Sequence, residues 1–512
     1  MNEIPLSARP VRVRFAPSPT GPLHMGGVRT ALYNYLFAKK HGGAFLLRIE
    51  DTDQARFVPG AEEYILESLR WCGIVPDEGQ GVGGPHAPYR QSERKPMYRQ
   101  YAQQLLDSEH AYYAFDTPEE LEAIRELALT AGNPNWQYNS ITRGSMKNSL
   151  TLPAEEVERR LASGEAYVVR AKIPRNEEVK FQDIIRGWVS VHTLNLDDKV
   201  LLKGDGMPTY HLANVVDDRL MDITHVIRGE EWLPSAPLHI LLYRFFQWEA
   251  PGFAHLPLLL RPDGNGKLSK RDGDRLGFPV FPLDWHNSET GETASGYRER
   301  GFLPEAFLNM LAFLGWNPGD NREVFSLAEL VDAFQLHKVH KAGARFDFEK
   351  AKWFNQQFLR NLPPASLAHL LKDDLLRRGV AVPAPAYLEK AAVLLLDRAV
   401  FSSDLYENGS YLFHAPAHYD AEMMSKKWTA DSPARLRILA ERFAALPAFS
   451  AEAAEGVFKS YLTETGLGFG VLGPVLRLAV NGVTVGPSVF DIMALLGREE
   501  SLKRIHAACD AN

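Results

Sequence analysis

The sequence is poor in cysteine. Its 512 residues contain only two, Cys72 and Cys509. Two cysteines cannot build a framework of disulfides, so we expect a reducing, cytoplasmic environment. They also exclude a zinc site of the usual kind, in which four ligands include several thiolates.

Long apolar runs and an excess of positive charge are also missing. No apolar stretch approaches the roughly 20 residues that span a bilayer, and the opening MNEIPLSARP lacks the apolar core of a secretory signal. We therefore expect no membrane association. The net charge of −7 does not favour unspecific binding to a polyanion. It does not exclude a nucleic acid partner, because local basic clusters decide such binding.

The order of predicted elements indicates an α/β fold with a parallel sheet. Residues 11–15 and 44–49 have the pattern of strands, and residues 26–40 and 61–71 have apolar residues at helical spacing. Two strands separated by one helix imply a parallel pair with a right-handed crossover. Ligands of such sheets bind beyond the carboxyl ends of the strands, where the sequences APSPTG and EDTD lie.

The chain is long enough for about three or four domains. The parallel-sheet pattern covers residues 1–91 and resumes at 206–275, and residues 92–205 read as an inserted mixed α/β domain. In the region 276–330, the segment 277–300 is rich in Gly, Ser and Thr, and we expect a surface insertion too polar to be core. Amphipathic helices dominate residues 331–512.

His24, Met25, Gly26 and Gly27 follow a predicted strand and begin a predicted helix. A glycine lets the backbone approach a ligand closely, and the helix start offers free N–H groups to a phosphate. His24 can donate a hydrogen bond to an oxyanion. The alternative is a helix that starts at glycine beside an ordinary surface histidine.

A basic loop, KLSKR, occupies residues 267–271. From Arg261 to Arg275 the chain has five basic and three acidic residues. Such a loop can bind a polyphosphate and neutralise the charge that develops on leaving pyrophosphate. The alternative is a solvated, charged loop with no ligand.

Together these motifs match a known family. The stretches RFAPSPTGPLHMGG, RIEDTD, VGGPHAPYRQSER, GMPTYHLANVVDD, THVIRGEEW and KLSKR occur in this order. The chain thereby resembles the bacterial-type glutamyl-tRNA synthetases, which are class I aminoacyl-tRNA synthetases. The match is strong from Arg12 to about Asn317 and looser beyond. It implies a Rossmann-like catalytic domain (1–91 and 206–275), an inserted domain that binds the tRNA acceptor end (92–205), a stem-contact region with a polar insertion (276–330) and an all-α anticodon-binding region (331–512).

The resemblance implies residues for glutamate. Arg14 matches the arginine that pairs with the γ-carboxylate, and a guanidinium can hold a carboxylate by two parallel hydrogen bonds. Glu50 matches the residue that faces the α-amine. The rest of the implied amino-acid site consists of Ala16, Ser18, Tyr210, Asn214 and Arg228.

The resemblance also implies ATP as a substrate, used with Mg²⁺. His24, Lys267 and Lys270 are the implied catalytic residues, because they would stabilise charge in the transition state. The implied ATP site consists of Ala16, Thr20, His24, Gly26, Glu231, Trp232, Leu268 at the adenine, and Lys270. No covalent nucleophile and no protein-bound metal are expected.

The sequence departs from the family pattern in three places. The HxGH-type motif ends in Gly27 instead of a second His. Some relatives carry zinc held by cysteines near the sequence AYYAFDTPEE, but Tyr112 and Ala114 stand there, so we predict no zinc. The segment 277–300 is longer than the usual link after KLSKR. Two interpretations of it stay equally open: a disordered tether and a contact with RNA.

A second basic region supports contact with RNA. Residues 337–360 contain six Lys or Arg, two acids and five large aromatics: Phe346, Phe348, Trp353, Phe354 and Phe358. Cations with stacking aromatics suit single-stranded RNA, whereas aromatics at this spacing also suit a helix core. Arg360 aligns with the arginine that senses the third anticodon base.

We predict that the protein is a cytoplasmic glutamate–tRNA ligase that charges tRNA(Glu). Members of this family are usually monomers, so we expect a monomer. An alternative is a non-discriminating enzyme that also charges tRNA(Gln) with glutamate. A glutaminyl-tRNA synthetase is disfavoured by RIEDTD and by Arg14, and a truncated relative that modifies a tRNA base would lack the helical half. A non-catalytic tRNA-binding protein would not need His24, Glu50 and Lys270 together, and a small nucleotidyltransferase would be shorter.

Overall fold

The computed structural model describes residues 9–287 and 289–511. The chain forms two compact units. Of the described residues, the first contains those up to Glu299 together with Phe307–Phe348, and the second contains Arg300–Ala306 and those from Glu349 onward. Within the described part of the chain, no helix is both long and apolar enough to cross a membrane.

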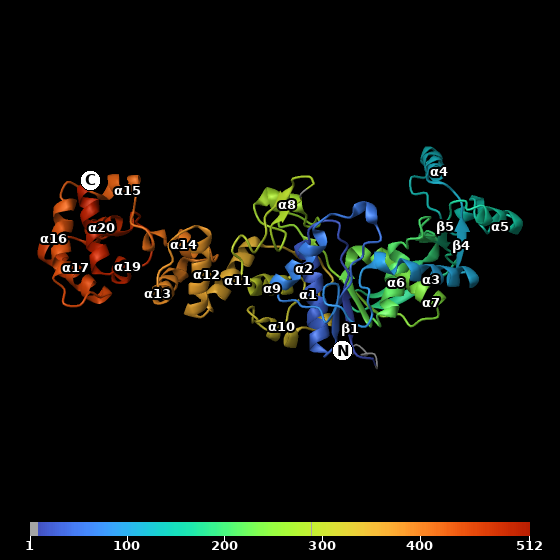
Figure 1. Ribbon diagram of the computed structural model, residues 1–512, viewed down its shortest axis with the longest axis horizontal. Coiled ribbons are helices and arrows are strands. Elements are labelled where there is room, and N and C mark those ends of the chain that lie inside the picture. Colours follow the sequence, from blue (N-terminus) through green and yellow to red (C-terminus); the bar gives the residue numbers. More distant parts are fainter. Residues whose placement is uncertain (1–8, 288, 512) are drawn as a thin grey trace. The chain divides into compact units, whose positions relative to one another are not determined.

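The first unit begins with the predicted βαβ arrangement. Strand β1 (Arg12–Phe15), helix α1 (Met25–Lys40), strand β2 (Ala44–Leu47) and helix α2 (Ala61–Trp71) follow in this order. Strands β1 and β2 are parallel, with Arg12 opposite Ala44 and Phe15 opposite Leu47, which confirms the prediction. Figure 1 shows α1 and α2 beside β1. The short strand β3 (Glu78–Gly79) completes a three-stranded sheet in the order β1-β2-β3.

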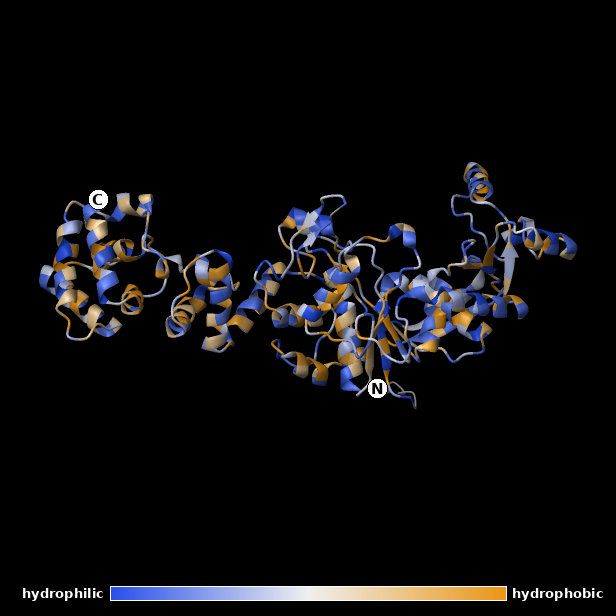
Figure 2. Cartoon of the chain, viewed as in Figure 1, coloured by the Kyte–Doolittle hydropathy of each residue, from blue (hydrophilic) through white to orange (hydrophobic). Residues whose placement is uncertain are grey.

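A second parallel group adjoins β1. Strands β9 (His225–Gly229) and β10 (Gly252–Leu256) are parallel, and the Thr224 N–H donates to the Arg12 carbonyl at 2.9 Å. Helices α6 (Tyr210–Leu220) and α7 (Ala236–Phe245) pack against each other (Figure 1). Figure 2 shows apolar residues on the strands, which is typical of a parallel sheet covered by helices. The parallel-sheet class predicted from the sequence is therefore confirmed.

The segment 92–205 contributes to two sheets. Its helices are α3 (Lys95–Asp107), α4 (Pro118–Thr130) and α5 (Ala154–Ala162), and strands β4 (Ala111–Ala114), β5 (Val168–Ala171) and β8 (Val200–Leu202) form a separate antiparallel sheet. Strands β6 (Glu178–Asp183) and β7 (Gly187–His192) form a hairpin that extends the other sheet in the order β7-β6-β10-β9. The sequence pattern did not reveal this pairing, because Phe253 and Asp183 come together from distant parts of the chain.

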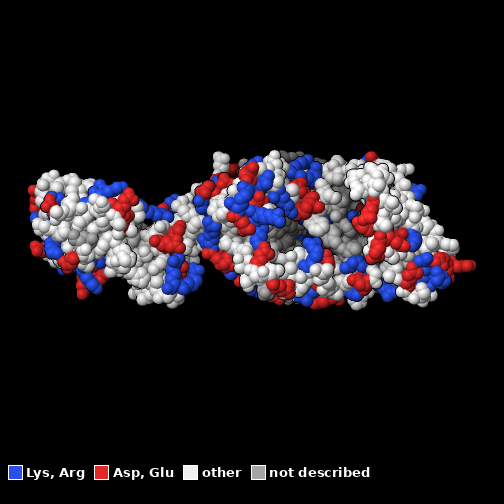
Figure 3. All heavy atoms as spheres, turned by 90° about the horizontal axis from the view of Figure 1, so that it is seen from above, with Lys and Arg blue, Asp and Glu red and all other residues white. Residues whose placement is uncertain are grey.

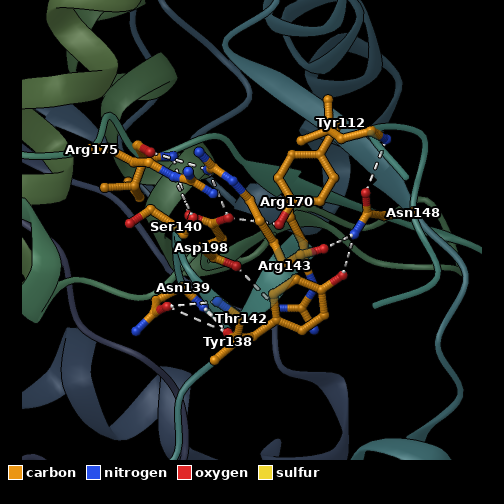
Figure 4. Close-up of polar contacts among 12 residues, drawn as sticks. Tyr112, Tyr138, Asn139, Ser140, Thr142, Arg143, Asn148, Arg170, Arg175 and Asp198 are labelled. Carbon is orange, nitrogen blue, oxygen red and sulfur yellow. Dashed lines mark hydrogen bonds and ion pairs between the residues drawn. The ribbon is translucent and has the colours of Figure 1, made fainter. Parts of the chain in front are cut away.

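A buried polar network holds the antiparallel part of this segment together (Figure 4). The Asp198 carboxylate accepts hydrogen bonds from the Tyr112 hydroxyl at 2.7 Å and from Arg143 Nη1 at 3.0 Å. The Arg170 guanidinium lies 4.0 Å from the centre of the Tyr138 ring. Burial raises the pKa of Asp198 despite these partners. Since a buried carboxylate needs such donors, the network fixes this region without thiolates.

The remaining elements of the first unit follow β10. They are β11 (Leu259–Leu260), α8 (Lys270–Leu276), β12 (Trp285–His286), β13 (Thr293–Ala294), α9 (Pro304–Phe313, whose first turn belongs to the second unit), α10 (Leu327–Ala333) and β14 (Ala344–Arg345). Strand β11 pairs in parallel with β14, so the loop before KLSKR is anchored by residues far along the chain.

The second unit is helical, as predicted. Its helices are α11 (Phe348–Arg360), α12 (Pro364–Arg377), α13 (Pro385–Leu395), α14 (Asp404–Glu407), α15 (Ala421–Lys427), α16 (Ser432–Ala444), α17 (Ala451–Thr465), α18 (Phe469–Asn481), α19 (Val489–Leu496) and α20 (Arg498–Ala511). Leucines, alanines and phenylalanines from most of these helices form one apolar core. In Figure 2 the helices carry apolar residues on one side, which is the pattern of amphipathic packing.

The aromatics of residues 337–360 divide between two roles. Phe346 and Phe354 are buried, so they are core residues. Trp353 is 36% exposed, and Lys350 Nζ lies 4.1 Å from the centre of its ring. Of these three, Trp353 alone is exposed, so contact of its ring with RNA stays a prediction.

Candidate functional site

A cavity of about 960 Å³ lies beyond the carboxyl ends of β1, β2 and β9. Figure 3 shows a hollow in the surface of the first unit with Lys and Arg beside it. Most of the predicted site residues line the cavity: Arg14, Ala16, Ser18, Thr20, His24, Gly26, Glu50, Tyr210, Asn214, Arg228, Glu231, Trp232 and Lys270. Lys267 and Leu268 are not among the lining residues, although Lys267 pairs with Glu231, which lines the cavity. Arg360 belongs to the second unit. The parallel sheet therefore brings together residues that are widely separated in sequence.

His24 caps helix α1 and lines the cavity. Its Nδ1 accepts a hydrogen bond from the Gly26 N–H at 3.1 Å. Burial, with a smaller contribution from the charge of Lys267, lowers the pKa of His24 to about 4. The ring is thus neutral near pH 7, and its proton is on Nε2. Nε2 is buried and has no hydrogen-bond partner among the residues described.

Gly27 occupies the place of the second histidine of the family motif. A Cβ at Gly27 would lie 2.5 Å from Leu23 Cδ1. The Leu23 side chain, which also lines the cavity, therefore fills the space that a residue with a side chain would enter. No second imidazole joins His24 at the start of this helix.

Arg14 is held by a buried acid. Its Nε and Nη2 donate to the two oxygens of Asp218 at 3.0 and 3.2 Å. Arg48 Nη1 reaches the same carboxylate at 2.7 Å. Burial would raise the pKa of Asp218, but the two arginines outweigh it and lower that pKa. Because the side-on donors of Arg14 are used, its end-on pair, Nη1–H and the second Nη2–H, remains for a ligand carboxylate.

Glu50 is positioned by the same cluster. Its Oε1 accepts hydrogen bonds from Arg48 Nη2 at 2.9 Å and from Asn214 Nδ2 at 3.1 Å. Arg48 is fully buried, and Asp218 and Glu50 outweigh the effect of burial and raise its pKa. Arg48 therefore positions both Asp218, which holds Arg14, and Glu50, which lines the cavity.

Arg228 and Tyr210 form the opposite side of the cavity. Arg228 Nη1 donates to the Tyr210 hydroxyl at 2.7 Å, and the Tyr210 and Trp232 ring centres lie 4.5 Å apart. Burial raises the pKa of Tyr210 to about 12, so the hydroxyl stays protonated. A cation, a hydroxyl and an aromatic face are thereby presented to one ligand.

The lysines of the KLSKR loop are paired with acids. Lys267 Nζ lies 3.2 Å from Glu231 Oε1, and Lys270 Nζ contacts Glu292 Oε1. The loop enters α8 through a capping box, in which Ser269 and Asp272 bond each other's backbone N–H groups. Leu268 is buried, and its N–H donates to the Leu259 carbonyl at 2.8 Å. The loop is thus ordered and places Lys270 on the cavity.

The expectation of a polar surface insertion at 277–300 holds for residues 289–293, which are exposed, but is wrong for the apolar part of the segment. Six of its apolar side chains are buried: Phe278, Val280, Phe281, Leu283, Trp285 and Tyr297. The Val280 carbonyl accepts from the Met25 N–H at 2.8 Å, and the Phe281 ring packs edge-on against His24 at 5.9 Å between centres. The available signal was the number of apolar residues in GFPVFPLDW, and the polar composition of the rest obscured it. The segment forms one wall of the cavity.

Comparison with known proteins identifies the family. Residues 10–353 match the catalytic domain of class I tRNA synthetases of the E and Q type, and residues 357–509 match an anticodon-binding domain. A glutamate–tRNA ligase from Cytophaga hutchinsonii is 56% identical over 501 residues, which cover 97% of each chain. The chain belongs to the glutamate–tRNA ligases. It therefore has glutamate, ATP and tRNA as substrates.

Other relatives agree. A glutamate–tRNA ligase from Porphyromonas gingivalis is 56% identical over 508 residues, which cover 98% of this chain and 99% of that protein. The crystal structure of a glutamate–tRNA ligase from Elizabethkingia meningosepticum, in complex with its amino acid, has a TM-score of 0.94 and 52% identity. It covers 98% of this chain and 99% of its own.

Sequence reasoning missed three residues of the ligase site. Arg48 and Asp218 are fully buried charges that carry Arg14 and Glu50, and Glu292 pairs with Lys270. Arg48 lies inside RIEDTD and Asp218 inside GMPTYHLANVVDD. A charged residue in an otherwise apolar strand or helix face was the signal, since charges are seldom fully buried unless they are paired.

Proposed function

We propose that this cavity activates glutamate with ATP and then transfers it to the 3′ end of tRNA(Glu). In the first step the α-carboxylate of glutamate attacks the α-phosphate of ATP, and pyrophosphate leaves. In the second step the terminal adenosine hydroxyl attacks the glutamyl adenylate, and AMP leaves. Both steps rest on placement and charge stabilisation, since no covalent nucleophile is needed. The observation that carries the proposal is the convergence of Arg14, His24, Arg228 and Lys270 on one cavity.

Each residue has a proposed role. The end-on donors of Arg14 bind the γ-carboxylate of glutamate, and Glu50 faces its α-amine. Tyr210, Asn214 and Arg228 complete this site with Ala16 and Ser18. The Nε2–H of His24 and the ammonium of Lys270 stabilise the phosphates, and Lys267 joins them when it leaves Glu231. The backbone near Ala16, Thr20 and Gly26 and the side chains of Glu231, Trp232 and Leu268 border the nucleotide.

We place Mg²⁺ with the nucleotide. Mg²⁺ binds through substrate phosphates with one or two carboxylates and keeps several waters. Asp53 and Glu231 line the cavity and fit this need. The described residues contain no cluster of three His, Cys, Asp or Glu side chains that could hold a metal. When bound, the ion would supply positive charge at the phosphates.

We further propose that the inserted segment 92–205 binds the tRNA acceptor end without zinc. Tyr112 and Ala114 stand where zinc-binding relatives have cysteine, and the hydrogen bond from Tyr112 to Asp198 belongs to a network that orders this region without a metal (Figure 4). In the helical unit we assign Arg360 to the third anticodon base. Its Nη2 donates to the Asp397 carbonyl at 3.1 Å, which orients it on α11. The region 276–330 would contact the tRNA stem, and the enzyme would act as a cytoplasmic monomer.

The proposed reaction is tested by ATP–pyrophosphate exchange. We expect exchange with glutamate only when tRNA is present, and none with glutamine. Exchange with glutamine alone would contradict the assignment, and no exchange under any condition would favour a tRNA-binding protein. Purified tRNA(Gln) serves as a second acceptor in the charging assay. Its charging with glutamate would identify the non-discriminating alternative.

Glu292 provides a test of Lys270. Glu292 pairs with the ammonium of Lys270 that we assign to the phosphates, so ATP would compete with this carboxylate. Replacing Glu292 with glutamine is expected to lower the KM for ATP about two- to fivefold, as for loss of an exposed ion pair. The control is Glu289→Gln, which changes the same charge on the same segment. A lower KM for ATP in both variants, or in neither, would contradict the proposal that Glu292 and ATP compete for Lys270.

A further inference from the structure

Arg228 is connected to a buried chain of polar side chains on its far side from the cavity. Its Nε donates to His255 Nε2 at 3.0 Å, and His255 Nδ1 lies 2.6 Å from Asp183 Oδ2. The three residues come from three neighbouring strands, β9, β10 and β6. Both His255 and Asp183 are inaccessible to solvent, with exposed fractions of 0% and 1%.

The direction of each hydrogen bond in this chain is fixed. An arginine is always charged and only donates, so His255 Nε2 must be an acceptor and carry no proton. The proton of the neutral ring is then on Nδ1, which donates to the Asp183 carboxylate. Burial lowers the pKa of His255, which keeps the ring neutral. The other oxygen of Asp183 accepts from the Ile185 and Arg186 N–H groups at 2.9 and 2.8 Å, so the carboxylate cannot rotate away.

The remaining donors of Arg228 are nearly all used. Nη1 donates to the Tyr210 hydroxyl and approaches His239 Nδ1 at 3.4 Å, and Nη2 donates to the Trp232 carbonyl at 3.3 Å. A guanidinium has five N–H groups. One N–H, on Nη2, is left for a ligand in the cavity that Arg228 lines. The orientation of that single donor depends on the partners of the other four.

We infer that Asp183 and His255 are positioning residues for glutamate binding, because they fix the rotation of Arg228 and so aim its last free N–H at the substrate. This inference rests on the proposed contact of Arg228 with glutamate. Asp183 sets the tautomer of His255, and His255 sets the orientation of Arg228. Without the acceptor at His255, the Nε–H of Arg228 is buried and unpaired, and the guanidinium turns to find another partner.

The test compares KM values in tRNA charging with the full-length enzyme. We expect His255→Leu to raise the KM for glutamate about tenfold or more, with the KM for ATP changed less than about twofold. His255→Gln keeps an oxygen that can accept from Arg228 Nε, so it is expected to recover most of the loss. Asp183→Asn keeps the shape but can donate as well as accept, so its effect is expected to be smaller than that of His255→Leu.

The matched control is His225→Leu. His225 is on the same strand as Arg228, is 4% exposed and bonds Thr224 Oγ1 at 2.9 Å, but it lies at the other end of the strand. It is expected to lose thermal stability without a change in the KM for glutamate. Equal KM values in the two leucine variants, or no recovery in His255→Gln, would overturn the positioning role.

Arg228→Lys separates this inference from the proposed function. If Arg228 binds glutamate, the lysine variant raises the KM for glutamate whatever His255 does. A normal KM in Arg228→Lys would reject the proposed contact itself. A raised KM for glutamate in Arg228→Lys with a normal KM for glutamate in His255→Leu would reject only the positioning role of His255 and Asp183. Should His255→Leu fail to fold, the same comparison is made with Asp183→Asn, which preserves side-chain volume and is expected to raise the KM for glutamate, and His255→Gln remains the recovering variant.

Discussion

Replacing His24 with alanine is expected to lower the rate of tRNA-dependent ATP–pyrophosphate exchange by about 100-fold or more, the loss typical of one transition-state donor. The reason is the state of its ring. Nδ1 is occupied by the Gly26 N–H, and a pKa of about 4 keeps the ring neutral, so Nε2–H is a donor at every pH of the assay. Bulk water does not compete for that donor, because Nε2 is buried.

The pH profile gives this prediction a second readout. A folded-state pKa of about 4, below the ordinary histidine pKa of 6.5, means that folding favours the neutral ring. The resulting stability is fully present above pH 6.5 and is lost as the pH falls toward 4. The His24-dependent part of the rate is therefore expected to be constant between pH 6.5 and 8.

His192 is the matched control for His24. It also caps the N-terminus of a short helix through Nδ1, which accepts from the Leu194 N–H at 3.2 Å, but it does not line the cavity. His192→Ala is expected to retain the normal exchange rate. A loss in His24→Ala no larger than that in His192→Ala would show that His24 acts only as a helix cap.

Replacing Arg14 with alanine is expected to lower kcat/KM for glutamate by about 100-fold or more, because it removes the buried charge pair that we propose with the γ-carboxylate. The KM for ATP is expected to change little. Alanine also leaves Asp218 with Arg48 as its remaining arginine partner, so the folded protein loses stability. Arg14→Lys keeps the charge but not the two parallel donors, and it is expected to bind glutamate weakly while it folds well.

Arg12 supplies the control for Arg14. It is on the same strand, and its Nη1 and Nη2 donate to the two carboxylate oxygens of Glu78 at 2.7 and 3.0 Å. Neither residue lines the cavity. Arg12→Lys is expected to leave the KM for glutamate unchanged. An unchanged KM and kcat in Arg14→Lys and Arg14→Ala would remove Arg14 from the glutamate site. Thermal unfolding measures separately the stability that is lost when Asp218 loses its ion pair with Arg14.

Much of the local structure was predictable because it depends on neighbours in sequence. The bounds predicted for α2 are the observed ones, Ala61–Trp71, and the predicted βαβ order is observed as well. The apolar spacing of these segments matches one element and no other, so the sequence favours them before any tertiary contact forms. The same periodicity predicted the helical second unit.

The segment 277–300 shows where this reasoning fails. Composition marks it as polar, but burial depends on where six apolar side chains point. Those side chains alternate irregularly around prolines and have neither a helical nor a strand period. Only the contacts of Val280 with Met25 and of Phe281 with His24 make the segment part of the site.

The sequence by itself determined the family, the parallel-sheet class and the residue types of the cavity, because these lie in contiguous motifs whose chemistry can be recognised. The tertiary structure decided how each charge is held. Asp218 on α6 meets Arg14 on β1 and Arg48 just after β2 only in the folded unit, and Asp183 on β6 meets His255 on β10 only because these strands are neighbours in the sheet. A buried ion needs a partner of opposite charge or a donor at hydrogen-bond distance. Strand order and register, which no short motif contains, supply those partners.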